Sequence, residues 1–201
     1  MILRTSPPSP FGRKVLLAAS VLGLSDKIAI QKADPSDESD SLRGQNPVGK
    51  IPILVLDDGT TLFDSRVILE YLDHLAGGGK IIPAQPKARF EALRLQALAD
   101  GVTDASLLVV YEGRFRPAER HEAKWLDYQN GKVARGLAVL EASPPPVDDV
   151  PTAGQIALAC LLGYRDLRFK GVWRDSHPRL VAWLDRFAAK VPEFERTKVT
   201  A

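Results

Sequence analysis

The periodicity of the apolar residues changes near residue 80, and this change constrains the fold more than any other feature of the sequence. Before it, short segments alternate between the patterns typical of strands and of helices. After it strands disappear, and long amphipathic helices are predicted over roughly 86–114, 117–142, 152–168 and 177–190, each bounded by proline or glycine. The sequence therefore predicts a small α/β domain followed by an all-helical domain.

The first part of the chain is predicted to run βαβ and then ββα. The expected strands are 1–5, 28–32, 51–56 and 60–63, with helices at 10–22 and 65–75. Asp58-Gly59 predicts the hairpin turn between the last two strands. A glycine and proline linker follows, so we divide the chain into residues 1–76, the linker 77–85 and the helical residues 86–201.

The stretch GQNPVGKIPILVL, residues 44–56, is close to a nucleotide-binding P-loop but fails two of its requirements. A P-loop has Ser or Thr after its lysine and begins a helix there. Here Ile51 follows Lys50, and Pro52 precedes a run of strand-forming residues. The sequence therefore predicts a strand entered through a proline. A cis Ile51–Pro52 bond would turn the Ile51 N–H and C=O outward, where they can pair with an extended peptide.

Composition excludes several classes of function. Lys and Arg number 27 against 25 Asp and Glu, and no basic run is interleaved with aromatic residues, so a nucleic-acid partner is not expected. Neither a signal peptide nor a membrane span is apparent, so we expect a cytoplasmic protein. Cys160 is the only cysteine, and His74, His121 and His177 are widely separated. We therefore expect no metal site, no disulfide within the chain and no Cys-x-x-Cys redox pair.

Two serines stand where helices are predicted to begin. Ser9 precedes Pro10 and fits an N-cap followed by proline in the first helical turn. Asp64 precedes Ser65 and fits an N-cap that accepts hydrogen bonds from amides of the next turn. Helix capping alone would explain these residues without any ligand.

The combination of motifs resembles the glutathione S-transferase superfamily. The resemblance rests on Asn46-Pro-Val-Gly-Lys-Ile-Pro52, on Asp64-Ser65 at a helix start and on the all-helical second half, and it covers essentially the whole chain. It implies a thioredoxin-like βαβαββα N-terminal domain with a helical-bundle C-terminal domain. Ser9-Pro10-Phe11 lies where omega-like members carry Cys-Pro-Phe/Tyr and where zeta- and theta-like members place a serine. The chain therefore resembles the serine-type members.

The resemblance implies that glutathione is the co-substrate. Ser9 would donate a hydrogen bond to the glutathione sulfur, and the positive end of the helix would favour the thiolate. Ser6 is the alternative donor, because it lies only three residues earlier.

The resemblance also implies how the rest of the tripeptide is bound. Ser65 and the amides of its helix would hold the γ-glutamyl carboxylate, and Asp64 would face the ammonium group. Most relatives have Glu or Gln at the position of Asp64. Lys50 would reach the glycyl carboxylate, and Ile51 and Pro52 would form the edge that pairs with the tripeptide backbone.

The helical half supplies further candidates. Asp100 and Asp104 lie four residues apart on one helix face, where like charges repel unless a cation lies opposite. By resemblance, Asp104 would contact the γ-glutamyl ammonium group across a dimer interface. A hydrophobic electrophile would lie between the domains, and its expected walls are Phe11, Tyr111, Phe115 and Tyr164.

The function implied is conjugation of glutathione to an electrophile by a homodimeric detoxification enzyme that uses no metal. A glutathione-dependent thiol or peroxide reductase is less favoured, because serine at position 9 cannot form a mixed disulfide with glutathione. A non-catalytic glutathione-binding or interaction module remains open.

Thr152 and Gln155 predict a capping box, while Cys160, Trp183 and Phe187 are expected to pack in the core.

Overall fold

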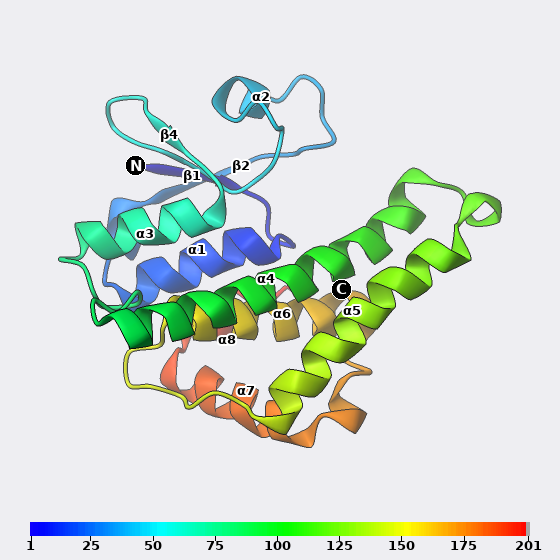
Figure 1. Cartoon of the computed structure of the whole chain (residues 1–201). Coiled ribbons are helices and arrows are strands. Elements are labelled where there is room, and N and C mark those ends of the chain that lie inside the picture. The colour runs from blue at the N-terminus through cyan, green and yellow to red at the C-terminus, as the bar shows by residue number, and fades with distance from the viewer. Residues whose placement is uncertain (200–201) are drawn as a thin grey trace.

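The computed structural model describes residues 1–199 and shows the two predicted parts (Figure 1). The N-terminal part contains a four-stranded mixed sheet in the order β2-β1-β3-β4. Strand β1 pairs in parallel with β2 and antiparallel with β3, which in turn pairs antiparallel with β4. The strands are β1 (Ile2–Thr5), β2 (Ala29–Lys32), β3 (Ile53–Val55) and β4 (Thr61–Leu62).

Two helices, α1 (Pro10–Val21) and α3 (Ser65–Leu75), lie between this sheet and the helical domain (Figure 1). A short helix α2 (Leu42–Gln45) precedes β3, and a 3-10 turn η1 (Ser25–Lys27) precedes β2. The βαβαββα order is therefore confirmed. The central pair Leu3 and Leu54 lies opposite in the β1–β3 ladder, and both side chains are fully buried.

The helical domain contains α4 (Pro86–Phe115), α5 (Ala123–Ala142), α6 (Ala153–Phe169), α7 (Pro178–Lys190) and α8 (Glu193–Arg196). The predicted helix 117–142 is wrong at its start. Residues Ala118–Arg120 form a separate 3-10 turn η2, and extended backbone at His121 separates that turn from α5. A third 3-10 turn, η3 (Arg174–Ser176), precedes α7. No helix within residues 1–199 is long and apolar enough to cross a membrane.

Helix α6 lies at the centre of the molecule, where it packs against both α4 and α1. The predicted capping box is present: the Thr152 hydroxyl accepts from the Gln155 amide at 3.3 Å, and the Gln155 side chain accepts from the Thr152 amide at 2.9 Å. Trp183 and Phe187 stack in the core with ring centroids 5.4 Å apart. A well-capped, buried α6 therefore fixes the position of α1 relative to the helical domain.

Candidate functional site

Ser9 is the N-cap of α1, as the sequence predicts. The Ser9 Oγ accepts a hydrogen bond from the Gly12 amide at 3.0 Å, and the Ser9 amide donates to the Ser6 carbonyl at 3.0 Å. A hydroxyl that accepts through a lone pair still has its own proton to donate. Capping of α1 and donation to a ligand are therefore compatible roles for Ser9. The Ser6 hydroxyl forms no hydrogen bond with residues 1–199, so it also keeps its proton available.

The strand entrance has the predicted geometry. The Ile51–Pro52 peptide bond is cis, and β3 begins only at Ile53, so the polar backbone groups of Ile51 lie outside the ladder. The buried Asn46 holds the preceding loop: its Nδ2 donates to the Lys50 carbonyl at 2.9 Å, and its Oδ1 accepts from the Val48 amide at 3.0 Å. Asn46 therefore positions the entrance, while the Lys50 side chain is exposed.

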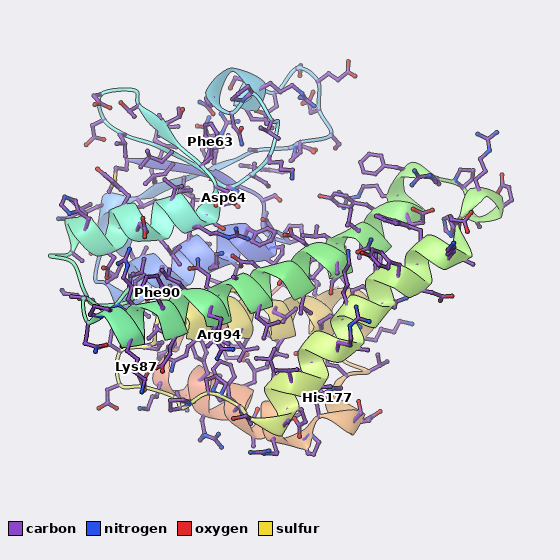
Figure 2. The ribbon with its side chains drawn as sticks, in the orientation of Figure 1. Phe63, Asp64, Lys87, Phe90, Arg94 and His177 are labelled. Carbon is purple, nitrogen blue, oxygen red and sulfur yellow. The ribbon has the colours of Figure 1, made fainter. Side chains whose placement is uncertain are left out.

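Asp64 and Ser65 begin α3 where β4 passes into that helix, and Figure 2 shows Phe63 and Asp64 at this junction. The Asp64 Oδ1 caps the helix by accepting from the Arg66 amide at 2.9 Å, as predicted. Its second carboxylate oxygen has no hydrogen-bond partner among residues 1–199. Ser65 is buried, yet its hydroxyl forms no hydrogen bond within the same residues. The start of α3 thus offers a free hydroxyl beside helix amides, a combination that suits a carboxylate.

Asp100 lies at the centre of a charged network that sequence analysis missed. Both of its carboxylate oxygens lie 2.8 Å from the Lys14 Nζ, and one lies 3.0 Å from the Arg66 Nε. The side chains of Lys14 and Asp100 are 1% and 3% exposed, whereas that of Arg66 is 52% exposed. The sequence contained one signal for this network. Asp100 and Asp104 repel each other on one helix face, and a cation opposite them relieves that repulsion.

Asp104 is exposed on α4 and belongs to the same electrostatic group. Partial desolvation raises the pKa of its carboxyl, and the Asp100 carboxylate adds to the rise. Arg66, Lys50 and Lys14 act in the opposite direction. Lys50 is therefore one of the cations that act on the Asp104 carboxyl.

A cavity of about 640 Å³ opens beside Ser9. Of the predicted walls, only Tyr164 lines this cavity. Phe115 is largely exposed at the end of α4, where it packs edge to face on Tyr111 with centroids 5.4 Å apart. Phe11 lies near the buried Lys14, whose Nζ is 5.3 Å from the ring centroid. The other walls come from residues 7–10, α1, α6, α7, α8 and the segments that follow α6 and α8. They include apolar side chains such as Leu167, Leu184 and Phe194 and charged ones such as Arg13, Asp166 and Arg174.

Cys160 also borders the cavity, but its side chain is only 3% exposed, and burial raises the pKa of its thiol to about 12. The raised pKa leaves very little reactive thiolate near neutral pH. We therefore expect a disulfide reagent to react very slowly with the native protein and promptly after unfolding in guanidinium. Thiol titration with and without denaturant measures the difference. Equal rates in the two conditions would contradict the assignment of Cys160 to the core.

Within residues 1–199, the structure contains no cluster of three or more His, Cys, Asp or Glu side chains arranged to hold a metal ion.

Comparison with known families gives two matches along the chain. The model of the glutathione S-transferase N-terminal domain matches residues 8–75, and the model of the C-terminal domain matches residues 101–186. Among curated proteins, an uncharacterized GST-like protein, YibF of Escherichia coli K12, is 32% identical over 98% of each chain.

Solved structures of similar proteins include a glutathione transferase family member from Pseudomonas fluorescens Pf-5 with bound glutathione. It is 40% identical, covers 100% of this chain and 99% of its own, and has a TM-score of 0.90. A second structure of a family member from that strain contains S-(propanoic acid)-glutathione. It is also 40% identical, with complete coverage of both chains and a TM-score of 0.86.

Proposed function

The chain belongs to the glutathione S-transferase superfamily, and on that premise we propose that it binds glutathione, stabilises the thiolate and conjugates it to an electrophilic small molecule. One observation carries the proposal: the Ser9 hydroxyl stands at the start of α1, keeps its proton available and borders a cavity of about 640 Å³. A thiolate bound at Ser9 would have room beside it for a small electrophile.

Ser9 acts on the sulfur by electrostatics and hydrogen bonding. Its O–H donates to the thiolate, and the positive N-terminal end of α1 favours the same negative charge. The thiol proton is lost to solvent, the sulfur forms a bond with the electrophilic carbon, and the leaving group departs with its electron pair. The protein forms no covalent bond and contributes ionisation and proximity.

The rest of glutathione is held by groups from both domains. Ser65 and the first amides of α3 bind the γ-glutamyl carboxylate, and the free oxygen of Asp64 binds the ammonium group. Asp104 contacts that ammonium group across the dimer interface. The exposed Lys50 pairs with the glycyl carboxylate, and the backbone of Ile51 pairs with the cysteinyl unit as an added strand. Because Asp64 already caps α3, its contact with the ammonium group uses only one oxygen.

Two alternatives lead to different experimental results. A reductase that forms a mixed disulfide would need an accessible thiolate, and Cys160 is buried with a raised pKa. A non-catalytic module would bind glutathione without turnover. The relative that holds S-(propanoic acid)-glutathione contains a thioether of glutathione, which favours conjugation for this chain as well.

Retention on immobilised glutathione, with elution by free glutathione, tests binding. A conjugation assay against several electrophiles then tests catalysis. Binding with turnover supports the proposal, binding without turnover favours the non-catalytic module, and absence of binding contradicts both. A glutathione-dependent disulfide exchange assay tests the reductase alternative.

Replacing Ser65 by alanine should weaken glutathione binding about tenfold to a hundredfold, because a hydrogen bond to a charged carboxylate is lost. The turnover of the saturated enzyme should change little, since that carboxylate is held equally in the ground and transition states. Calorimetry gives the affinity, and initial rates give kcat. Ser20→Ala on α1 is the matched control and should leave both values unchanged. A fall in kcat at unchanged affinity would contradict this role for Ser65.

We further propose a homodimer formed through α3 and the first part of α4. Val67 and Phe90 are exposed there, and Figure 2 labels Phe90 on the first part of α4 together with Lys87 and Arg94. A groove between the helices is lined by the apolar Val67, Leu93 and Ala97 and by the polar Arg66, Glu70 and Gln96. A second copy of this chain would cover these apolar side chains. Sedimentation equilibrium measures the oligomeric state.

A detoxification role and a cytoplasmic location stay predictions.

A further inference from the structure

One wall of the cavity beside Ser9 is formed by residues 194–199, which we call the C-terminal segment. It comprises the last three residues of α8 and the three residues that follow that helix. The cavity is lined by all of them except Arg196, that is, by Phe194, Glu195, Thr197, Lys198 and Val199. The position of the C-terminal segment therefore sets the size of the space available next to Ser9.

The C-terminal segment has open space on two sides. A second cavity, of about 500 Å³, is lined by residues 196–199 together with Ile30 and Lys32 of β2. Phe194 is anchored in the core, where it packs edge to face on Phe187 with ring centroids 5.8 Å apart. The rest of the segment is a thin wall between the two cavities. Such a wall has little packing to hold it in place.

Arg13 of α1 supplies polar contacts that hold this wall. Its Nε donates to the Thr197 hydroxyl at 3.1 Å, and its Nη2 donates to the Phe194 carbonyl. Its guanidinium carbon also lies 4.1 Å from the centroid of the Phe194 ring. The Thr197 hydroxyl donates in turn to the Glu193 carbonyl at 2.8 Å, which ties the residue after α8 back to the start of that helix. One arginine side chain thus contacts the C-terminal segment at three points.

The charge of Arg13 depends on the same contacts. Burial lowers the pKa of its guanidinium, while Glu195 and Asp166 act in the opposite direction. Each of these carboxylates is engaged by another cation: Asp166 pairs with Arg174 at 2.6 Å, and Glu195 pairs with Lys198 at 3.4 Å. Among residues 1–199, the carbonyl, hydroxyl and aromatic ring of the segment are therefore the groups in contact with this partly buried cation.

The sequence of α6 leaves room for the Arg13 side chain. A Cβ atom at position 163 would clash with the Arg13 Nη1 and would lie 3.4 Å from the Phe194 ring. Gly163 therefore allows the guanidinium to lie against both α6 and the C-terminal segment. On α1, Arg13 follows Ser9 by four residues, and its amide donates to the Ser9 carbonyl at 3.0 Å. The helix that presents Ser9 is thus linked directly to a wall of the cavity.

Fold stability accounts for part of this arrangement, because a contact between α1 and α8 stabilises the protein whether or not a ligand binds. That role does not require the contacted segment to line the cavity beside Ser9. Nor does it require open space on two sides of the segment, which leaves its position dependent on Arg13.

We propose that Arg13 is a positioning residue: it holds the C-terminal segment as a wall of the cavity beside Ser9 and so determines how tightly the electrophile is bound there. This inference rests on the proposed function and assigns a specificity-determining residue to it. Phe194 and Val199 of the segment, with Leu184 of α7, give this part of the cavity an apolar surface. A longer alkyl group on the glutathione sulfur should therefore gain affinity from contact with it.

Two thioethers of glutathione test the proposal without turnover. S-hexylglutathione and S-methylglutathione differ only in the length of the alkyl chain, and neither has a thiolate on which the Arg13 charge would act. Calorimetry gives both affinities. In the wild-type protein we expect the hexyl compound to bind at least about tenfold more tightly than the methyl compound, because its chain is buried in the cavity.

Variants of the contact should reduce this advantage. Arg13→Met removes both donors, and Thr197→Val removes one acceptor at the surface, which tests the same contact if Arg13→Met does not fold. Gly163→Ala displaces the guanidinium but keeps its charge. Each variant should lower the ratio of the two affinities at least about threefold and leave the affinity for S-methylglutathione within about twofold. Arg135→Met, on the exposed face of α5, is the matched control and should change neither value.

Hydrogen exchange followed by mass spectrometry locates the effect. The amides of Thr197 and Lys198 donate to the carbonyls of Glu193 and Glu195, so their exchange reports whether the segment is held. Arg13→Met should accelerate exchange in the C-terminal segment at least about tenfold in the ligand-free protein. In the wild type, S-hexylglutathione should slow it more than S-methylglutathione does.

The outcomes distinguish this inference from the proposed function. An affinity ratio that is unchanged in all three variants would overturn the role of Arg13 even if the protein is a transferase. Unchanged exchange in Arg13→Met would also overturn it, because the segment would then be held by other contacts. Binding of both thioethers with the expected ratios, but without turnover of any electrophile, would support the role of Arg13 and overturn the proposed catalysis alone. Failure of the wild type to bind either thioether would overturn both.

Discussion

Replacing Asp100 by alanine should lower the free energy of unfolding by about 3–5 kcal/mol, because the substitution leaves a buried ammonium group without its counter-ion. The Lys14 Nζ is 2.8 Å from both oxygens of Asp100, and the Lys14 side chain is only 1% exposed. Since Lys14 belongs to α1 and Asp100 to α4, the loss weakens the contact between the two domains. Urea unfolding followed by circular dichroism measures the change.

Two further variants identify the cause. Arg66→Ala removes the exposed partner of Asp100 and should cost less than about 1 kcal/mol. The double variant Lys14→Met/Asp100→Leu removes both buried charges and should be clearly more stable than Asp100→Ala. If the double variant were no more stable than Asp100→Ala, loss of packing and not the unpaired charge would explain the result. A cost below about 1 kcal/mol for Asp100→Ala would contradict the buried ion pair itself.

Replacing Ser9 by alanine should raise the pKa of the bound glutathione thiol by about one to two units, because a hydrogen bond to its thiolate is lost. The turnover rate near neutral pH should then fall about tenfold to a hundredfold, and the affinity for glutathione should stay almost unchanged. The ultraviolet absorbance of the bound thiolate, titrated against pH, gives the pKa directly. The pH profile of kcat/KM for the electrophile, measured at saturating glutathione, should shift upward by the same amount.

The helix cap requires a separate control, because the Ser9 Oγ also accepts from the Gly12 amide at 3.0 Å. Loss of the cap alone destabilises the protein by about 1 kcal/mol. Ser9→Asp preserves a capping oxygen but cannot donate to the thiolate, and its negative charge repels it. We therefore expect Ser9→Asp to retain the stability of the wild type and to raise the thiol pKa more than Ser9→Ala. Unchanged titrations in both variants would assign the thiolate contact to Ser6 or to the amides of α1.

The features that the sequence predicts correctly depend on residues close to one another in the chain. Ser9, Asp64 and Thr152 each cap a helix by a hydrogen bond to a residue two or three positions later. Such bonds follow from residue type and local backbone geometry alone. The strand entrance at Pro52 is of the same kind, because proline lacks the donor that a helix or a central strand requires there.

The sequence pattern failed to locate the start of α5. The helix predicted to start at residue 117 begins instead at Ala123, because the chain first forms the 3-10 turn Ala118–Arg120. Pro117 favours a helix start, and residues 118–122 are mostly polar types that a helix tolerates, so the sequence does not show where the hydrogen bonds are interrupted.

The sequence by itself determined the two-domain organisation and the helix caps, because these depend on local patterns of residue type. The candidate contacts with glutathione came from the resemblance to the family and stay predictions. Only the tertiary structure placed Lys14 against Asp100, which lie 86 positions apart in the chain. Likewise it was packing that put Tyr164 in the cavity beside Ser9 and left Phe115 exposed at the end of α4. Burial and ion pairing between distant segments depend on how whole helices pack, and no local rule specifies that packing.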